Sequence, residues 1–359
     1  MHSRLHTRAL RVGPLALGGG APVSVQTMAT ADPHDAAALA AQVARCAEAG
    51  ADLVRLTVPD ADAARVLGEV RNASPVPLVA DIHFDYRCAL AAIEAGADAL
   101  RLNPGNIGAR ENVQAVARAA KAKGVPIRVG VNGGSLEADI LKKHGSATAE
   151  ALVESALRHV ALLEAEGFRD IAISVKASDV PRTLAAYRML AERTDCPLHL
   201  GVTEAGEGED GRIKSAVGIG ALLADGIGDT IRVSLSEEPE AEIPVAYAIL
   251  QAARLRITKT EYISCPGCGR TLYNLQETIA RVKAATSHLV GLKIAIMGCI
   301  VNGPGEMADA DYGYVGAGPG RISLYKGKEC VEKNIPEAEA VDKLLALISR
   351  NEERGTKNH

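Results

Sequence analysis

Short runs of β-branched and other apolar residues alternate with helical stretches rich in Ala and Leu along the first two thirds of the chain. This alternation is typical of successive βα units that build a parallel sheet. Eight such units within about 250 residues predict a (β/α)8 TIM barrel of the α/β class, with a doubly wound open sheet as the alternative. The eight predicted strands are Val23–Met28, Asp52–Val58, Leu78–Phe84, Ala99–Asn103, Ile127–Val131, Ile171–Ala177, Leu198–Thr203 and Thr230–Leu235. The helical segments between them include Asp35–Ala49, Arg110–Lys123, Thr148–Glu166 and Thr183–Arg193.

An internal repeat supports the barrel. The segment Glu48–Thr57 (EAGADLVRLT) returns as Glu94–Asn103 (EAGADALRLN). In both copies a helix ends at Gly and a strand follows, which agrees with the preference for Gly just after a helix. Two short apolar strands around Gly13 predict a hairpin that precedes the barrel.

The pattern changes after an eighth barrel helix, which is predicted at Glu240–Arg256. The rest of the chain predicts a smaller α+β domain, so residues 1–257 should form the barrel and residues 258–359 the second domain. A linker is expected at Ile257–Thr260. The elements predicted in the second domain are strands at Glu261–Ser264 and Lys293–Met297, a hairpin of Tyr312–Val315 and Arg321–Lys326, and helices at Asn274–Ser287 and Pro336–Arg350.

Polar residues recur at alternate positions near the ends of the predicted strands. Side chains alternate between the two faces of a strand, so residues i and i+2 share a face. Because apolar helices must pack on the outer face, the polar set is predicted to point into the lumen near the carboxyl ends of the strands, where TIM barrels build active sites. The set comprises Ser24, Gln26, Arg55, Thr57, Asp81, His83, Arg101, Asn103, Arg128, Asn132, Ser174, Lys176, His199, Thr203, Arg232 and Ser234.

Five cations belong to this set. Burying charges without partners is prohibitive, and by position in the sequence only Asp81 and Glu204 lie near enough to neutralise them. A single Arg could pair with an acid on an outer loop. Five cations at equivalent strand positions instead predict a polyanionic substrate, most naturally one with two phosphates, held by charge-assisted bonds. The predicted substrate-binding residues are Arg55, His83, Arg101, Asn103, Arg128, Asn132, Lys176, Arg232 and Ser234.

Three residues allow two interpretations each. His83 and His199 are either functional groups or core histidines with satisfied hydrogen bonds. Glu204, in the segment Gly201–Gly206 (GVTEAG), follows the seventh strand at the predicted mouth of the barrel. It is the best candidate for a catalytic acid or base, and the alternative is an ion-pair partner for an Arg.

Composition narrows the function classes. The chain has 359 residues, of which 47% are hydrophobic, so it can bury a full core and disorder is excluded for most of it. A net charge of −4 does not favour a nucleic-acid partner or an acidic membrane surface. No stretch approaches about 20 uncharged apolar residues, and the basic segment Met1–Arg11 lacks the apolar region of a signal peptide. The expectation is a soluble cytoplasmic protein.

The spacing of three cysteines predicts that they bind one metal centre. The turn of Cys265-Pro-Gly-Cys268 directs two sulfurs to one side, and Cys299 lies in a loop rich in Gly and Pro. Soft thiolates select zinc or an iron–sulfur cluster. Structural zinc usually takes a second close pair of ligands, whereas a cluster accepts a distant single cysteine. The spacing favours the cluster and leaves open a phosphate-binding barrel with a zinc-stabilised interaction module and no redox chemistry. The other cysteines, predicted to be structural, are Cys46, Cys88, Cys196 and Cys330.

The two cysteine motifs, Cys265–Thr271 (CPGCGRT) and Met297–Glu306 (MGCIVNGPGE), resemble the signature of the bacterial 4-hydroxy-3-methylbut-2-enyl diphosphate synthases of the non-mevalonate isoprenoid pathway. The resemblance is to the compact two-domain form and covers nearly the whole chain. Thr27 stands where many members have Ser. The other segments that carry the resemblance are Val25–Met28, Asp81–Phe84, Arg101–Gly105, Val129–Ser135 and Leu200–Gly206.

The resemblance implies a reductive dehydration of 2-C-methyl-D-erythritol 2,4-cyclodiphosphate, with electrons from ferredoxin or flavodoxin. It implies a [4Fe–4S] cluster held by Cys265, Cys268 and Cys299, with Glu306 as an exchangeable fourth ligand at the iron that acts on substrate. Glu204 and Glu306 are then the expected catalytic residues. The resemblance also implies a homodimer in which the barrel of one subunit faces the cluster domain of the other, with the Ile257–Thr260 linker as a hinge.

Overall fold

The computed structural model of the chain describes residues 3–301, 303–307 and 309–355. The chain divides into two compact units, Met1–Arg256 and Ile257–His359, each with its own buried apolar core. The boundary lies one residue before the one expected from the sequence.

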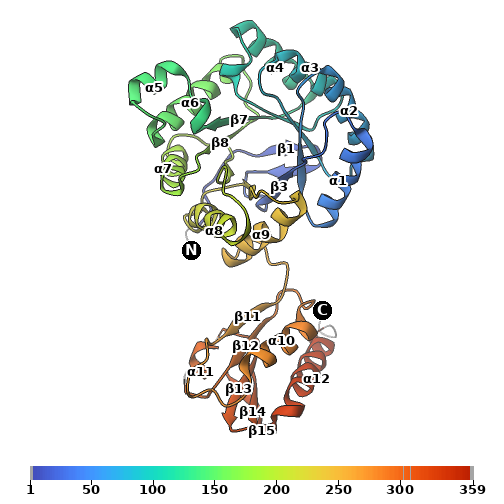
Figure 1. Cartoon of the computed structure of the whole chain (residues 1–359), viewed down its shortest axis with the longest axis vertical. Coiled ribbons are helices and arrows are strands. Elements are labelled where there is room, and N and C mark those ends of the chain that lie inside the picture. Colours follow the sequence, from blue (N-terminus) through green and yellow to red (C-terminus); the bar gives the residue numbers. More distant parts are fainter. Residues whose placement is uncertain (1–2, 302, 308, 356–359) are drawn as a thin grey trace. The chain divides into compact units, whose positions relative to one another are not determined.

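The first unit contains an eight-stranded parallel sheet with the order β8-β7-β6-β5-β4-β3-β10-β9 (Figure 1). A parallel bridge between Ile173 and Leu198 joins the two ends of this order and closes the barrel. All eight predicted strands are present, so the TIM-barrel prediction is confirmed and the open doubly wound sheet is wrong. The strands are β3 (Ser24–Met28), β4 (Leu53–Thr57), β5 (Leu78–Asp81), β6 (Ala99–Leu102), β7 (Ile127–Asn132), β8 (Ile171–Lys176), β9 (His199–Leu200) and β10 (Thr230–Ile231).

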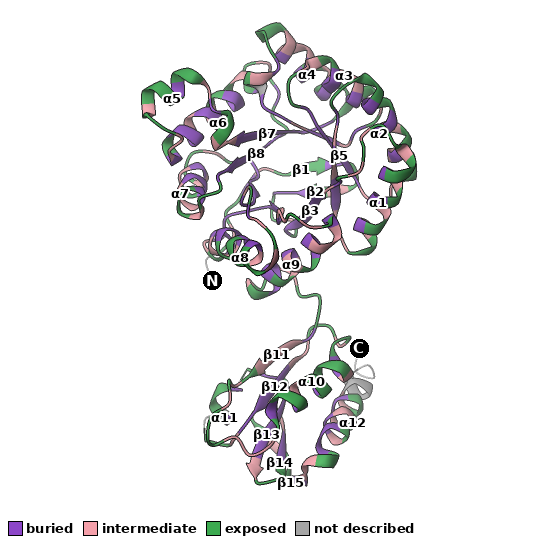
Figure 2. Cartoon of the chain, viewed as in Figure 1, coloured by how far each residue is buried: buried purple, intermediate pink, exposed green. Residues whose placement is uncertain are grey.

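Helices surround the sheet, and their solvent-facing sides are exposed (Figures 1 and 2). Several begin where an Asp side chain accepts a hydrogen bond from a backbone N–H of the first turn, as Asp35, Asp60, Asp85 and Asp179 do. The helices are α1 (Ala36–Glu48), α2 (Ala61–Ala73), α3 (Tyr86–Glu94), α4 (Arg110–Lys123), α5 (Ala138–His144), α6 (Ala149–Glu164), α7 (Val180–Ala191), α8 (Gly208–Ala224) and α9 (Pro239–Ala252).

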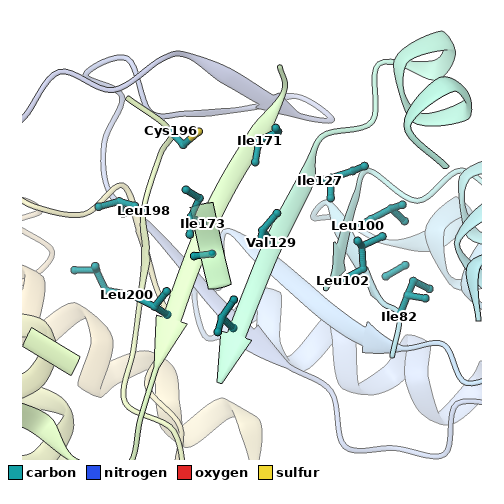
Figure 3. Close-up of a cluster of buried hydrophobic side chains, with 14 of the residues drawn as sticks. Ile82, Leu100, Leu102, Ile127, Val129, Ile171, Ile173, Cys196, Leu198 and Leu200 are labelled. Carbon is teal, nitrogen blue, oxygen red and sulfur yellow. The ribbon is translucent and has the colours of Figure 1, made fainter. Parts of the chain in front are cut away.

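The main core lies between the outer face of the strands and the helices. Figure 3 shows part of it, including Ile127 and Val129 of β7 and Ile171 and Ile173 of β8, all of which are buried. Val54, Leu56 and Val58 belong to the same core, as their alternation with Arg55 and Thr57 predicts. The structural role predicted for three of the cysteines is also confirmed, because the buried side chains of this core include Cys46, Cys88 and Cys196.

The predicted hairpin is present as β1 (Leu10–Val12) and β2 (Leu15–Leu17), and it closes the amino-terminal end of the lumen. Leu10, Val12 and Leu17 of this hairpin are buried against the first lumen-facing residues of four strands, which are Leu53, Val79, Ala99 and Ala172. The segment before it is tied to the end of the barrel sequence, since Thr7 Oγ1 donates to Asp229 at 2.9 Å. The apolar plug leaves the carboxyl-terminal half of the lumen to polar residues.

The second unit is a mixed sheet with the order β11-β12-β13-β14-β15, parallel from β11 to β13 and antiparallel beyond. Helices α10 (Leu275–Thr286) and α12 (Glu337–Gly355) bury an apolar core against it. The structure contains all the elements predicted for this unit. It also contains strand β15, which carries Cys330 and was not predicted. The strands are β11 (Glu261–Ser264), β12 (Lys293–Met297), β13 (Tyr312–Gly318), β14 (Arg321–Lys326) and β15 (Glu329–Pro336).

No helix within the described ranges is long and apolar enough to span a membrane.

Candidate functional site

The five predicted cations lie together inside the lumen, and Arg128, the second residue of β7, also lines a small cavity beside Leu10 and Leu17 of the hairpin. Four stand on β4, β6, β7 and β8, and the fifth follows the last residue of β10. Arg101 pairs in register with both Asp81 and Arg128 on the neighbouring strands. The five cations, which the alternation along the strands predicts to come together, are Arg55, Arg101, Arg128, Lys176 and Arg232. Burial lowers the pKa values of Arg55, Arg128 and Lys176, and the charges of neighbouring cations act in the same direction.

Two buried carboxylates neutralise part of this charge. Asp81 lies 3.1 Å from Arg101 and 3.5 Å from Arg55. Burial alone would raise the pKa of Asp81, but the charges of these two arginines lower it overall, so it is ionised at neutral pH. Arg232 is held by Glu242 of α9 at 3.1 Å. The expectation that Glu204 would be the second neutralising acid is therefore wrong, because a residue from the last barrel helix takes that position.

Arg128 and Lys176 have no carboxylate within 4 Å among the described residues. Each is only 7% exposed. Arg128 donates to Gln26 at 2.7 Å, but its Nε and Nη2 atoms are buried with no partner in the described part of the chain. Burial, together with the neighbouring cations, lowers the pKa of both groups well below the ordinary values. The lumen therefore holds more positive than negative charge, with donors left over for an anion.

Two glycines make room for these long side chains. A Cβ at Gly130 would lie 2.5 Å from Arg101 Nε. A Cβ at Gly201 would lie 2.7 Å from both Lys176 Nζ and the carbonyl oxygen of Arg232. The carbonyl oxygen of Arg232 belongs to the backbone and cannot rotate away as a side chain can. Only glycine therefore fits at position 201 without a shift of the chain.

A cavity of about 500 Å³ opens beside the cations. Four of the predicted substrate-binding residues line it: His83, Arg101, Asn103 and Asn132. His83 lies in the loop beyond β5 and is exposed, so it reaches the cavity from the mouth and not from a strand position. The Nδ2 atom of Asn103 is buried without a partner among the described residues. The cavity thus combines one cation of the lumen with His83 and two Asn side chains from the carboxyl-terminal ends of three successive strands.

The remaining predicted residues fall into different places. Ser234 is half-buried in the loop after β10, which ends three residues earlier. His199 is fully buried, and burial, followed by the charges of Arg128 and Lys176, lowers its pKa well below 6.5. Its Nε2 atom is buried with no hydrogen-bond partner among the described residues, so the structure does not support a core histidine with satisfied hydrogen bonds. Glu204 is exposed and has φ +52°, a left-handed conformation that is uncommon for a residue with a side chain.

Sequence reasoning gave no role in the site to three residues next to the cations. Met28 of β3 places its Sδ atom 2.7 Å from Arg55 Nη2 and 3.7 Å from Arg232 Nη1. The hydroxyl of Thr27 donates a hydrogen bond to Glu242 at 2.7 Å. A Ser at this position would also carry a hydroxyl. Glu242 could have been found as an acidic residue on the side of α9 that faces the barrel. That side can be identified only when the register of the helix is known.

The second unit gathers the predicted metal ligands at one edge of its sheet. Because β11 and β12 pair in parallel, with Ser264 opposite Ile296, Cys265 and Cys299 both follow the carboxyl ends of neighbouring strands. Gly267, with φ +79°, allows the turn that connects Cys265 to Cys268. These cysteines and Glu306, from the short helix α11 (Gly303–Glu306), line one cavity of about 420 Å³. Asn302, in the same motif, lies outside the described residues.

The segment Thr271–Tyr273 holds the two cysteine loops together. The N–H of Cys268 donates to Thr271 Oγ1 at 3.0 Å, and Tyr273 donates through its hydroxyl to the carbonyl of Met297 at 3.0 Å. The backbone N–H of Gly298 donates to Cys265 Sγ at 3.1 Å.

Comparisons with known proteins cover both units. Residues 7–247 match the family model described as the GcpE TIM-barrel domain, and residues 261–350 match the GcpE protein C-terminal domain. The 4-hydroxy-3-methylbut-2-en-1-yl diphosphate synthase (flavodoxin) of Geobacter sulfurreducens is 52% identical over 348 residues, which are 96% of this chain and 97% of that protein. The protein of the same name from Symbiobacterium thermophilum is 51% identical over 351 residues, which are 98% of this chain and 94% of that protein.

Among solved structures, the type I 3-dehydroquinate dehydratase of Clostridium difficile superposes with a TM-score of 0.51 at 12% identity, over 69% of this chain and 99% of that one. This likeness concerns the barrel fold alone. The family models match residues of both units, and the two relatives align along nearly the whole chain, so the resemblance carried by the cysteine motifs is confirmed. The chain belongs to the GcpE family.

Proposed function

We propose that this protein is a 4-hydroxy-3-methylbut-2-en-1-yl diphosphate synthase that reductively opens 2-C-methyl-D-erythritol 2,4-cyclodiphosphate. The observation that carries the proposal is the surplus of buried positive charge in the lumen, where five cations face the carboxylates Asp81 and Glu242. A cyclic diphosphate brings one negative charge on each phosphorus and suits this surplus. Both curated relatives described above carry the name of this enzyme.

The reaction balances as follows. Two electrons and one proton enter, the bond between the tertiary carbon and its phosphate oxygen breaks, the neighbouring hydroxyl takes up the proton and leaves as water, and a carbon–carbon double bond forms. Ring opening converts a phosphodiester into a terminal phosphate, which gains negative charge. Arg128 and Lys176, which have no carboxylate partner within 4 Å among the described residues, are the groups best able to stabilise that charge as it develops.

The residues of the second unit fit an iron–sulfur cluster. Three cysteines and Glu306 surround a cavity of about 420 Å³. No three His, Cys, Asp or Glu side chains among the described residues stand close enough together to hold one metal ion. A cluster is larger than an ion and is held by thiolates around its corners. We assign Cys265, Cys268 and Cys299 as cluster ligands and Glu306 as the exchangeable fourth ligand. When bound, a [4Fe–4S] cluster would supply the electrons and a Lewis-acidic iron.

We assign Glu204 as the candidate proton donor at the barrel mouth. Its carboxylate has no ion-pair partner within the described residues, which removes the support for an Arg-orienting role. Strained backbone of this kind clusters at functional sites, where the surrounding structure holds it in place. The proton that the reaction consumes would reach the leaving hydroxyl from this side.

The partners follow from the same proposal. The relatives' names include flavodoxin, so we propose flavodoxin, with ferredoxin as the alternative, as the electron donor. We also propose that the protein acts in the cytoplasm as a homodimer, with a site shared between the barrel of one subunit and the cluster domain of the other, and with the Ile257–Thr260 linker as the hinge.

The test is anaerobic purification followed by incubation with the cyclic diphosphate and a chemical reductant. We expect a brown protein with four irons and acid-labile sulfide per chain, and 4-hydroxy-3-methylbut-2-enyl diphosphate as the product. One zinc per chain, no sulfide and no product would support the phosphate-binding barrel with a zinc module instead. Iron–sulfur content without product would leave the cofactor assignment standing and reject the substrate.

A second prediction concerns pH. Lys176 has a lowered pKa in the free protein because of its burial and the charges of Arg128 and Arg232. Two phosphate charges beside it would raise that pKa, so binding above the free-protein pKa must take up a proton. The affinity should fall as the pH rises through this range, by up to about tenfold per pH unit. Calorimetry in buffers of different ionisation enthalpy measures the uptake. Equal heats in all buffers would contradict it, and Lys176→Met should abolish the difference between buffers.

A further inference from the structure

Two loops border the candidate substrate cavity, and each contains a single turn of 3₁₀ helix. The first follows β6, contains η1 (Pro104–Asn106), and contributes Asn103 and Asn106 to the lining. The second follows β7 and contains η2 (Gly133–Ser135). It contributes Gly134, Ser135 and Leu136 to the lining, next to Asn132, the last residue of β7. The geometry of the cavity therefore depends on how these two loops are held relative to each other.

A buried histidine on α6 packs directly against the first loop. His159 is only 1% exposed. A Cβ added to Gly105 would overlap His159 Nε2 and would lie 3.2 Å from its Cε1 atom and 3.3 Å from its Cδ2 atom. The N–H of Gly105 in turn donates to Asn103 Oδ1 at 3.1 Å. The imidazole ring thus packs against the turn that orients the amide of Asn103, which lines the cavity.

The same histidine contacts the second loop through Glu137. Its Nε2 atom lies 2.9 Å from Glu137 Oε1, and Glu137 directly follows Leu136 of the cavity lining. Glu137 Oε2 accepts a hydrogen bond from Ser155 of α6 at 2.7 Å, which ties the second loop to the helix that carries His159. Burial lowers the pKa of His159, although the charge of Glu137 acts in the opposite direction, so the ring is neutral at neutral pH.

We propose that His159 is a positioning residue for the substrate site. It locks the loops after β6 and β7 to one helix through Gly105 and Glu137, and so sets the spacing between Asn103 and Asn132. The inference rests on the proposed function for the identity of the substrate. His159 acts through the two loops, since its ring is covered by Gly105 and lies beneath the turn.

The contact between His159 and Gly105 can be tested by enlarging one residue and truncating the other. Gly105→Ala should push the first loop away from α6 and raise the KM for the cyclic diphosphate about tenfold, with kcat changed less than about threefold, because misplaced binding groups lose orientation. His159→Ala opens space at the same point. The double variant should therefore have a KM nearer to that of His159→Ala alone than to the product of the two separate effects. Iron content and the visible spectrum should match those of the unmodified protein throughout.

A matched control is Gly220→Ala on α8, where a Cβ would meet its nearest neighbour at 3.9 Å. This variant should leave KM unchanged. A role for His159 in core packing alone would lower the thermal stability of His159→Ala without changing KM, and that result would overturn the proposal. So would an effect of Gly105→Ala that is the same with and without His159.

Failure of the proposed function gives a different pattern. If the unmodified protein does not turn over the cyclic diphosphate, the substrate is wrong, and the lock is then read from the thermal stability of the same four proteins. Non-additive shifts in Tm for Gly105→Ala and His159→Ala would support the contact between loop and helix, and additive shifts would reject it.

Discussion

Replacing Arg128 with Met is expected to stabilise the protein while it weakens binding of the cyclic diphosphate. Arg128 is buried, two of its nitrogens have no partner in the described part of the chain, and burial beside Arg55 and Arg101 lowers its pKa well below the ordinary value. Removing an underpaired buried charge should add about 1 kcal/mol or more to the free energy of unfolding. Losing its charge-assisted bonds to a phosphate should weaken binding about 10- to 100-fold.

Calorimetric Tm and the Kd for substrate, measured on the same anaerobic preparation, check both halves of this prediction. Arg212→Met is the matched control, because Arg212 forms a bidentate pair with Glu237 at 2.6 and 2.7 Å outside the lumen. Its removal should change Tm little, because an exposed ion pair contributes little to stability, and should leave Kd unchanged. A lower Tm with an unchanged Kd for Arg128→Met would mean that the cation serves the fold and not the ligand.

Replacing Cys299 with Ser is expected to remove the iron–sulfur cluster and nearly all activity. The cysteine lines the cavity that Cys265, Cys268 and Glu306 share. Since outer-shell changes at metal sites already cost about 10- to 100-fold in affinity or activity, losing a ligand should cost more than about 100-fold. Iron and sulfide analysis with turnover measures the effect.

Cys330→Ser is the control for that experiment. Cys330 is half-buried like Cys299 and belongs to the same unit, but it stands on β15, where its sulfur lies 3.8 Å from the carbonyl oxygen of Glu332. Iron content and turnover should be unchanged. Full iron content in Cys299→Ser, or equal losses in both variants, would refute the ligand assignment.

The sequence predicted the barrel because each strand carries two independent signals. Alternation separated Val54 and Leu56, which pack outward, from Arg55, which points inward, and the Gly-terminated helices fixed the period of the repeat. The same alternation brought the five cations together before their contacts were known. Cys265 and Cys299 could be grouped from spacing because parallel neighbouring strands end at the same edge.

The limits of sequence reading have physical causes. Alternation holds only while the chain is paired, and β5, β9 and β10 end earlier than predicted, so the positions of His83 and Ser234 could not follow from it. Glu242 reaches Arg232 from a helix ten residues further along, and that contact depends on the angle at which α9 packs. The positioning role proposed for His159 depends on its close contact with Gly105, which belongs to a different βα unit. No local sequence pattern predicts such a contact.

The hairpin that plugs the barrel also has a consequence for the order of folding. Its residues are synthesised before the strands that they plug, yet their neighbours include Ala172, and Thr7 just before the hairpin donates a hydrogen bond to Asp229, 222 positions later in the chain. Contacts of such large separation form late, because the loop-closure entropy must be overcome before they form. We therefore expect the hairpin to be fixed after the barrel strands, so that its burial reports completed closure of the barrel.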